Sequence, residues 1–163
     1  MDSLPSIHIR PIRPDDTVRL KVLLGELSPE TRYMRFHQIV HDFTAEQWRY
    51  LTCVDGRDHV ALVACAGDRI VGVSRYIRDR ERPDVAEVAF VVSDRFQRRG
   101  VGRTLRDRLV TVARDNGIRS FVAIVKPQNT RIRKLMSGGG LTLLSARFDL
   151  LEASLVGCES AAE

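Results

Sequence analysis

The sequence predicts a single α/β domain in which a mixed, mostly antiparallel sheet carries helices on both faces. Two observations favour this class: apolar strands alternate with amphipathic helices, and a strand, loop, helix and strand near the middle imply one parallel pair. The 163 residues suffice for one hydrophobic core, and 44% hydrophobic with 29% charged residues is typical of globular domains. We expect the domain to span residues 1–155 and residues 156–163 to form a flexible tail.

The N-terminal third is predicted to contain one strand and three helices. Residues 7–12 alternate apolar and polar side chains, as a half-buried strand does, and a helix follows toward Leu24. Ser28 and Thr44 each stand where a helix N-cap is expected, and Thr44 forms a capping box with Gln47.

Three consecutive strands and a long helix are predicted in the middle of the chain. The apolar runs 59–66 and 69–76 flank a turn at Gly67, so they predict an antiparallel hairpin, and residues 85–92 supply a third strand. In residues 101–115 apolar side chains recur at steps of three and four, which predicts an amphipathic helix.

The C-terminal part is predicted to complete the sheet. Residues 120–125 form a continuous apolar run, suited to a central strand that is parallel to its predecessor because a helix connects the two. A short helix through about Met136 ends at the glycines 138–140, and residues 141–144 and 147–151 are expected to form a closing hairpin.

The chain is basic, with a net charge of +5 and a pI near 9.6, which favours an anionic partner. No recognised nucleic-acid motif accompanies the charge, so we do not expect nucleic acid as a partner. No apolar run is long enough for a membrane span, and we expect no membrane association and a cytoplasmic location. Much of the positive charge falls in one region: Arg95, Arg98, Arg99, Arg103, Arg106 and Arg108.

Neither cysteine nor histidine spacing indicates a metal site. Cys53, Cys65 and Cys158 contain no CxxC pair, so mostly buried, reduced thiols are expected. His37 and His41 lie four apart, but the glutamate of an HExxH motif does not follow His37. The sequence therefore predicts no metal.

The segment from Gln97 to Arg103 joins a strand to a helix and is rich in hydrogen-bond donors. The first N–H groups of a helix lack partners within it and attract anions, and Gly100 and Gly102 leave room for a phosphate beside the backbone. A dinucleotide-binding loop would need a third glycine at Leu105, and no Gly-Lys-Ser/Thr follows. A simpler alternative is that the two glycines only permit a tight turn.

The same segment resembles a known family. Gln97-Arg98-Arg99-Gly100-Val101-Gly102 matches the Q/R-x-x-G-x-G/A signature of the GNAT N-acetyltransferases, and residues 86–92 resemble the strand that precedes it. Asn129 falls at an asparagine common in the family. Leu27 to Tyr33 is similar to a segment of the bacterial protein-lysine acetyltransferase branch.

The resemblance implies acetyl-CoA as co-substrate. Main-chain N–H groups of the loop would hold the pyrophosphate, and the preceding strand would splay to admit the pantetheine arm, with Val91 or Val92 polarising the thioester carbonyl. Asn129 would bond the pantetheine, act as a helix N-cap, or both. The implied cofactor-binding residues are Phe90, Val91, Val92, Gln97, Arg98, Arg99, Gly100, Val101, Gly102, Arg103 and Asn129.

Amine acetylation requires a base, because an ordinary lysine is protonated near neutral pH. Glu87 shares a strand face with Ala89 and Val91 and is the candidate catalytic base, directly or through water. The alternative is an exposed glutamate beside Arg75 or Arg78. Many relatives carry a tyrosine acid in the helix after Asn129, but this chain has none there. Its tyrosines are Tyr33, Tyr50 and Tyr76.

The predicted function is acetyl transfer from acetyl-CoA to a primary amine, with a protein lysine as the acceptor. A small-amine acetyltransferase and a non-catalytic acyl-CoA sensor are the alternatives. The expected assembly is a monomer or homodimer. Four aromatic residues are candidates either for an acceptor groove or for core packing: Phe36, Phe43, Trp48 and Tyr50.

Overall fold

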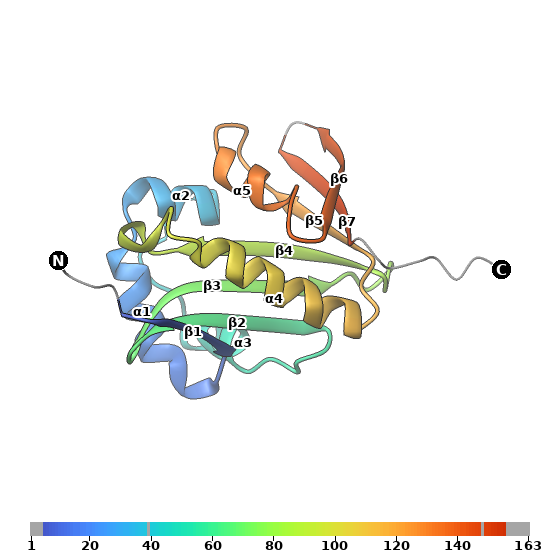
Figure 1. Cartoon of the computed structure of the whole chain (residues 1–163). Helices are drawn as coiled ribbons and strands as arrows, with labels where there is room; N and C mark the ends of the chain where they lie inside the picture. Colours follow the sequence, from blue (N-terminus) through green and yellow to red (C-terminus); the bar gives the residue numbers. More distant parts are fainter. Residues whose placement is uncertain (1–4, 39, 148, 156–163) are drawn as a thin grey trace.

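A seven-stranded sheet forms the centre of the computed structural model, which describes residues 5–38, 40–147 and 149–155. The strand order is β1-β2-β3-β4-β5-β7-β6 (Figure 1), and β4 and β5 form the parallel pair among antiparallel neighbours. This arrangement confirms the predicted mixed sheet. The strands are β1 Ile7–Pro11, β2 His59–Ala66, β3 Arg69–Arg78, β4 Val85–Val92, β5 Ser120–Ile124, β6 Leu141–Arg147 and β7 Leu150–Leu155.

Helices cover both faces of the sheet, as predicted (Figure 1). Both expected N-caps are present: the Ser28 hydroxyl accepts a hydrogen bond from the Thr31 N–H at 3.1 Å, and Thr44 and Gln47 form the reciprocal capping box. The helices are α1 Thr17–Glu26, α2 Pro29–Phe36, α3 Ala45–Thr52, α4 Val101–Asp115 and α5 Thr130–Leu135. Two 3-10 turns accompany them, η1 Pro14–Asp16 and η2 Asp94–Phe96.

Two apolar cores flank the sheet. One lies between the sheet and α4 and contains Leu105, Leu109 and Phe121. The other lies between the sheet and the helices α1 and α3 and contains Leu20 and Trp48. Every residue of β2 is buried, because this strand is covered on both sides. Alternate residues of β3 and β4 therefore face different cores and, as shown below, different parts of the site.

Helix α4 approaches β3 closely because Gly72 has no side chain. A Cβ atom there would lie 3.0 Å from Leu105 Cδ1 and 3.2 Å from the Val91 carbonyl oxygen, both too near for ordinary packing. Gly72 thus fixes the height of α4 above the sheet, and with it the position of the helix start.

The C-terminal hairpin differs from the expectation. Arg147 was expected to begin its second strand, but it ends β6 and pairs with Leu150. The register shifts between Leu143 and Ser145, which leaves Leu144 in a bulge. A bulge adds a residue that a regular period of two does not contain, so strand alternation alone misplaces the turn. The expected tail, residues 156–163, lies outside the described residues, and so does Cys158.

The glycines 138–140 lie against the middle of α4. A Cβ atom on Gly139 would collide with the side chains of Arg106 and Asp107, and one on Gly140 would lie 2.8 Å from Arg114 Nη2. Both glycines also have a positive φ. They therefore let the chain pass over the arginines of α4.

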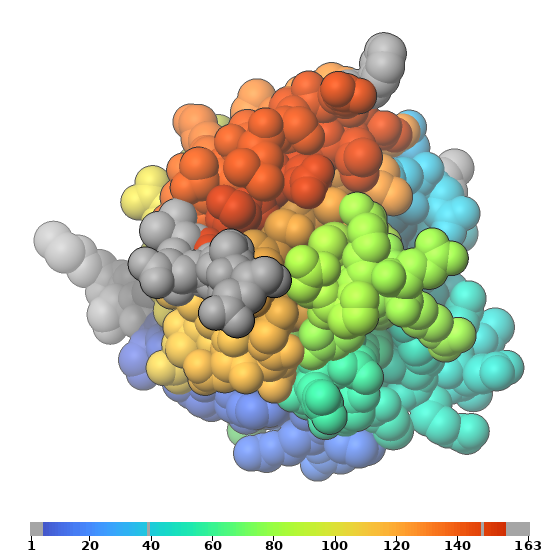
Figure 2. All heavy atoms as spheres, turned by 90° about the vertical axis from the view of Figure 1, so that its right-hand side faces the viewer, coloured from blue at the N-terminus to red at the C-terminus, as the bar shows by residue number. Residues whose placement is uncertain are grey.

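The connection between β3 and β4 closes the sheet at the end opposite η2. Arg78 ties this end together, donating from Nε to Asp58 at 2.8 Å and from Nη2 to the Asn116 carbonyl at 2.6 Å. Figure 2 looks onto this end, where the yellow-green connection lies beside the amber end of α4. The other end of the sheet carries the candidate site.

Candidate functional site

Strands β4 and β5 separate along their length. Their parallel pairing covers Val85 to Glu87 on β4 and ends where Glu87 lies opposite Val122. Beyond that point β4 continues for five residues, through Val92, without a partner on β5, whereas β5 stays paired with β7 as far as Ile124. One edge of the second half of β4 therefore faces a gap, as expected from the sequence.

The direction of each N–H group in that half of β4 follows from its pairing with β3. The Ser93 N–H donates to the Val71 carbonyl at 2.8 Å, so Ser93 points toward β3. Along a strand this direction alternates, and the N–H of Val91 also points toward β3. The N–H groups of Phe90 and Val92 consequently face the gap. Of the two expected candidates for a carbonyl partner, Val92 is the one so oriented.

The loop between η2 and α4 presents its backbone to solvent. Arg98 and Gly100 have positive φ values of 61° and 83°, which turn the chain sharply into α4. The first intrahelical donor is Thr104, whose N–H bonds the Gly100 carbonyl at 3.0 Å. The N–H groups of residues 98–103 have no acceptor among the described residues. A run of unpaired donors at a helix start fits a phosphate group.

Side chains around this loop differ in what they can contact. Arg98, Arg99 and Arg103 are exposed and make no ion pair with a described residue, so their charges are available to an anion. Val101 is only 4% exposed and packs in the core, so it offers only its backbone. Arg106 is also buried, where it bonds Asp107 and the Leu135 carbonyl, and it is therefore not part of the free arginine cluster.

Gln97 joins the loop to the end of β4. Its side-chain amide donates to the Val92 carbonyl at 3.0 Å and to the Thr31 hydroxyl at 3.4 Å. A Cβ atom on Gly102 would lie 3.4 Å from Leu135 Cδ1 and 3.9 Å from Val92 Cγ2, which are ordinary packing distances. Gly102 therefore lies where α4 faces α5 and the end of β4, and Gln97 holds the loop against that same strand end.

An acidic side chain links the loop to helix α2. The Asp94 carboxylate accepts hydrogen bonds from the Ser28 N–H and hydroxyl, both at 2.9 Å, and from the Thr31 hydroxyl at 2.6 Å. These bonds hold the pKa of Asp94 below its usual value, although partial burial acts in the opposite direction and is the largest single influence. These bonds tie the start of α2 to η2, directly before the loop.

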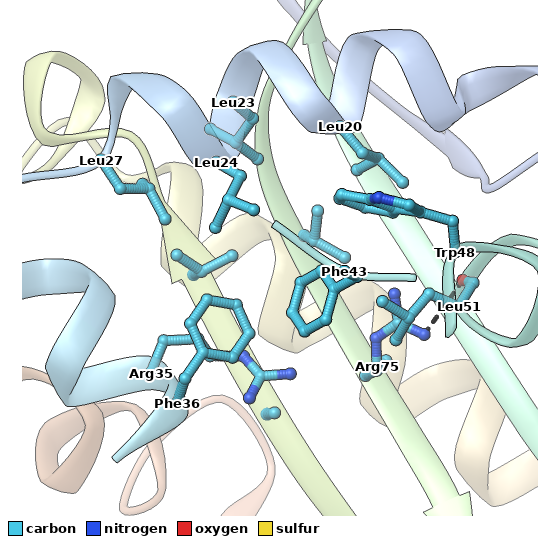
Figure 3. Close-up of a pocket in the computed structure, with 13 residues that line it drawn as sticks. Leu20, Leu23, Leu24, Leu27, Arg35, Phe36, Phe43, Trp48, Leu51 and Arg75 are labelled. Carbon is cyan, nitrogen blue, oxygen red and sulfur yellow. Dashed lines mark hydrogen bonds between the residues drawn. The ribbon is translucent and has the colours of Figure 1, made fainter. Parts of the chain in front are cut away.

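A pocket lies on the face of β4 that points away from α4, beneath α1, α2 and α3 (Figure 3). It is open to solvent at its mouth, the space inside it for water-sized molecules is about 60 Å³, and Ala89 and Val91 form part of its floor. We call it the acceptor-side pocket. Its walls are mostly apolar and include Leu20, Leu24, Phe36, Phe43, Trp48 and Leu51.

Three of the four aromatic groove candidates line this pocket. The rings of Phe36 and Phe43 meet edge to face at 5.4 Å, and those of Phe43 and Trp48 do so at 5.0 Å. Trp48 is also part of the buried core, so groove lining and core packing coincide in one residue. Tyr50 does not line the pocket; it is exposed and its ring lies 5.0 Å from that of His59.

Two arginines enter the apolar pocket from different elements, Arg35 from α2 and Arg75 from β3 (Figure 3). Arg75 is 6% exposed; its Nη1 donates to the Leu51 carbonyl at 3.1 Å and to His59 Nε2 at 2.9 Å. Since an arginine N–H can only donate, Nε2 of His59 accepts and is unprotonated. Burial, followed by the charge of Arg75, lowers the pKa of His59 to about 4.

Glu87 lies on the pocket face of β4, in line with Ala89 and Val91. Its side chain is exposed rather than enclosed by apolar neighbours, as the alternative anticipated. It forms no ion pair with Arg75 or Arg78 among the described residues, but its charge acts on Arg35. Glu87 is thus a solvent-accessible carboxylate near the mouth of the pocket, on the opposite side of β4 from α4.

Asn129, the last of the expected cofactor-binding residues, lies at the start of α5, whereas Tyr76 and Tyr33 lie elsewhere. Asn129 caps α5 by accepting a hydrogen bond from the Ile132 N–H at 3.4 Å, so its helix-capping role is present. Tyr76 is buried and bonds Arg57 and Asn116, away from the gap. Tyr33 lies on α2, with the Lys126 ammonium 5.6 Å from its ring centroid.

Other chemistries find little support in the described part of the chain. No three His, Cys, Asp or Glu side chains gather there as a metal site requires. Cys65 is buried, and burial raises the pKa of its thiol, whereas Cys53 is exposed and departs from the expected burial. No helix in the same residues is long and apolar enough to cross a bilayer.

Sequence reasoning missed Arg35, Arg75, His59 and Asp94. Arg75 could have been recognised from the sequence, because it is a charged residue within a strand that is otherwise mostly apolar and buried. The other three become notable only through contacts between segments far apart in the chain.

Comparisons with known proteins agree with this architecture. Residues 23–137 match the Acetyltransferase (GNAT) family. Acetyltransferase Pat of Mycolicibacterium smegmatis is 36% identical over 131 residues, which are 79% of this chain and 39% of that protein. Acetyltransferase PA5475 of Pseudomonas aeruginosa is 30% identical over 139 residues, covering 83% of this chain and 74% of the relative. The chain thus spans about two fifths of the length of the first relative.

A solved structure shows the same fold. The GNAT domain of S. lividans PAT superposes with a TM-score of 0.82 at 33% identity, and the match covers 91% of this chain and 89% of that domain. An acetyltransferase of the GNAT family from Streptococcus pneumoniae superposes with a TM-score of 0.75 at 18% identity, covering 93% of this chain and all of that one. The architecture is therefore shared even where the sequence has diverged.

Proposed function

The chain belongs to the GNAT acetyltransferase family, and on this premise we propose that it transfers an acetyl group from acetyl-CoA to the side-chain amine of a protein lysine. The observation that carries the proposal is the unpaired run of N–H groups at residues 98–103, next to the gap between β4 and β5. The N–H groups can bind a phosphate, and the gap can hold a long, thin arm. A co-substrate that carries both therefore fits this site.

In this proposal the loop binds the pyrophosphate. The N–H groups of residues 98–103, including those of Val101 and Gly102, donate to its oxygens, and the exposed arginines Arg98, Arg99 and Arg103 balance its charge. Gly100 places the start of α4 and leaves the approach to the backbone open. Gln97 holds the loop against the end of β4.

The pantetheine arm would lie along the free edge of β4. Phe90 and Val92 offer their N–H groups to it, and we assign the thioester carbonyl to the Val92 N–H rather than to that of Val91. A donor there stabilises the negative charge that develops on this oxygen during attack. Asn129 borders the gap as the cap of α5 and can also contact the arm.

Glu87 would serve as the general base. Removing a proton from the lysine ammonium, directly or through water, frees the nitrogen lone pair to attack the thioester carbon. The attacking nitrogen gives up its second proton to solvent, the carbon–sulfur bond breaks, and coenzyme A leaves as a thiolate that takes a proton from solvent. No tyrosine stands on α5, and a thiolate leaves readily enough to need no enzyme acid. The products are an acetylated lysine and coenzyme A.

A protein lysine is favoured over a small amine by the similarity of Leu27 to Tyr33 to the protein-lysine acetyltransferase branch. In the structure this segment starts α2, which is tied to the cofactor loop by Asp94 and borders the acceptor-side pocket through Phe36. The open surroundings of Glu87 also suit a side chain on a large acceptor. We further propose a cytoplasmic monomer or homodimer.

Calorimetry with acetyl-CoA, followed by turnover with lysine peptides and small amines, tests the proposal. We expect saturable binding of acetyl-CoA and release of free coenzyme A only when a lysine peptide is present. Preference for a small amine would replace the acceptor class, and binding without turnover on any amine would indicate an acyl-CoA sensor. Failure to bind coenzyme A at millimolar concentration would remove the proposal altogether.

A further inference from the structure

The acceptor-side pocket is apolar, yet two positive charges lie inside it, and no acidic side chain among the described residues forms an ion pair with either. Arg35 and Arg75 come from α2 and β3, and Figure 3 shows both guanidinium groups among the apolar walls formed by Phe36, Phe43 and Leu51. Burying a charge without a counter-charge is costly, so such an arrangement requires an explanation.

Neither partner of Arg75 carries a negative charge. Its Nη1 bonds a backbone carbonyl and a neutral imidazole, that of His59. The remaining N–H groups, on Nε and Nη2, have no acceptor among the described residues. Burial, and secondarily the charge of Arg35, lowers the pKa of Arg75 to about 10, which still leaves it protonated at neutral pH.

Arg35 is half-buried and makes no hydrogen bond or ion pair with a described residue. Its guanidinium carbon lies 4.9 Å from the centroid of the Phe36 ring. Burial lowers the pKa of Arg35 to about 10, and the charge of Glu87 acts in the opposite direction without forming an ion pair. Glu87 also has its own proposed role as base, so it cannot serve as a permanent counter-charge.

A carboxylate on a small apolar body matches this pocket. Two guanidinium groups can hold one carboxylate through several charge-assisted hydrogen bonds, and the apolar walls can cover the carbon atoms beside it. A phosphate carries more charge and would be repelled more strongly by Glu87 at the mouth. The floor residues Ala89 and Val91 place this subsite on the same stretch of β4 as the proposed thioester position.

We propose that the acceptor-side pocket is a carboxylate subsite, in which Arg35 and Arg75 bind an aspartate or glutamate side chain that flanks the reacting lysine of the acceptor. The assignment deepens the proposed function and rests on it. It makes the enzyme selective for lysines with an acidic neighbour, a selectivity set by this pocket and not by the cofactor loop.

Trp48 allows a binding test that does not depend on activity, because it is the only tryptophan in the chain and lines the pocket. We expect 4-methylpentanoate to change its fluorescence saturably, with at least about tenfold weaker binding of the uncharged 4-methylpentanamide. Arg35→Gln should remove the difference, whereas Arg49→Gln, on the exposed side of α3, should keep it. Equal binding of acid and amide, or tighter binding of inorganic phosphate, would overturn the subsite.

Turnover with matched peptides completes the test. Peptides that differ only by Glu or Gln next to the lysine should differ about tenfold in kcat/KM, and Arg35→Gln should abolish this ratio while Arg35→Lys retains part of it. Arg75→Gln should act in the same direction. Equal kcat/KM for both peptides would overturn the inference. If neither peptide is acetylated but the acid still binds at Trp48, the lysine acceptor is wrong and the carboxylate subsite stands.

Discussion

The two candidate sites beside β4 use different parts of the polypeptide: one uses backbone groups and the other uses side chains. On the side of the gap, the candidate cofactor site consists of backbone N–H groups from one continuous stretch, residues 90–103. On the pocket side, the candidate acceptor site consists of side chains from α1, α2, α3 and β3. The cofactor site, made of backbone groups, is therefore sensitive to local conformation. The acceptor site, made of side chains, is sensitive to charge and to packing between distant segments.

Replacing Glu87 by glutamine should cause the largest loss of activity, and the loss should come from the pocket side of β4 alone. It removes the proposed base on the pocket side, so kcat should fall about 10²- to 10⁴-fold, while acetyl-CoA affinity stays within about twofold. Steady-state kinetics and calorimetry measure the two quantities. A comparable loss in acetyl-CoA affinity would mean that the two sides are not separable.

Lowering the pH should destabilise the pocket side through His59. Its folded pKa, about 4, lies below the ordinary value of 6.5, so the unfolded chain binds more protons between these values. The stability that neutral His59 contributes is present above about pH 6.5 and is lost as the pH falls toward 4. From pH 7 to pH 5 we expect a loss of about 2 kcal/mol in urea unfolding.

The substitution His59→Gln should flatten this pH dependence. Glutamine cannot be protonated but can still accept a hydrogen bond from Arg75. An unchanged slope in the variant would assign the loss to another group. The lowered carboxylate pKa values of Asp55 and Asp94 act only at more acidic pH.

Replacing Gly100 by valine should weaken the cofactor side selectively. A Cβ atom there meets no atom within 4 Å, so the effect comes from the φ of +83°, which costs a β-branched residue about 1–3 kcal/mol. As the loop relaxes and its N–H groups turn away, acetyl-CoA should bind about tenfold more weakly in calorimetry.

Gly117→Val is the matched control for this strain. Gly117 has a φ of +80° and equally open surroundings, but it lies at the far end of α4. We expect it to lower stability to a similar degree without changing acetyl-CoA affinity. Equal losses of affinity in both variants would indicate general destabilisation and not a phosphate cradle.

Replacing Asp94 by asparagine should cause the smallest change in kinetics, and the change should concern both acetyl-CoA and the acceptor. Its carboxylate joins Ser28 and Thr31 of α2 to the cofactor loop, so a weaker link should raise KM for acetyl-CoA and for the acceptor peptide, each by about fivefold. Asp79 accepts hydrogen bonds from the Glu81 and Arg82 N–H groups in the connection between β3 and β4, at the end of the sheet opposite η2. Asp79→Asn weakens these bonds and should change neither KM. A change confined to one substrate would show that the sides are not coupled through Asp94.

Local signals explain why much of the fold could be predicted. The N-cap of Ser28 and the capping box of Thr44 and Gln47 act within a few residues, and the structure has both where they were expected. The bulge at Leu144 was missed because it depends on how β6 pairs with β7, which no local pattern specifies. The glycines 138–140 follow the end of the short helix as expected, but their contacts with the arginines of α4 depend on tertiary packing and could not be predicted.

By itself the sequence determined the strand order along the chain, the helix starts and the loop whose glycines leave backbone donors free. These are short-range properties, fixed by φ, by missing side chains and by the periodicity of apolar residues. Tertiary structure alone decided that Arg35 meets Arg75 in one pocket, that Asp94 reaches α2, and that Val92 faces the gap. These features depend on which strands pair and how deeply each helix packs, because distant side chains meet only after the sheet has formed.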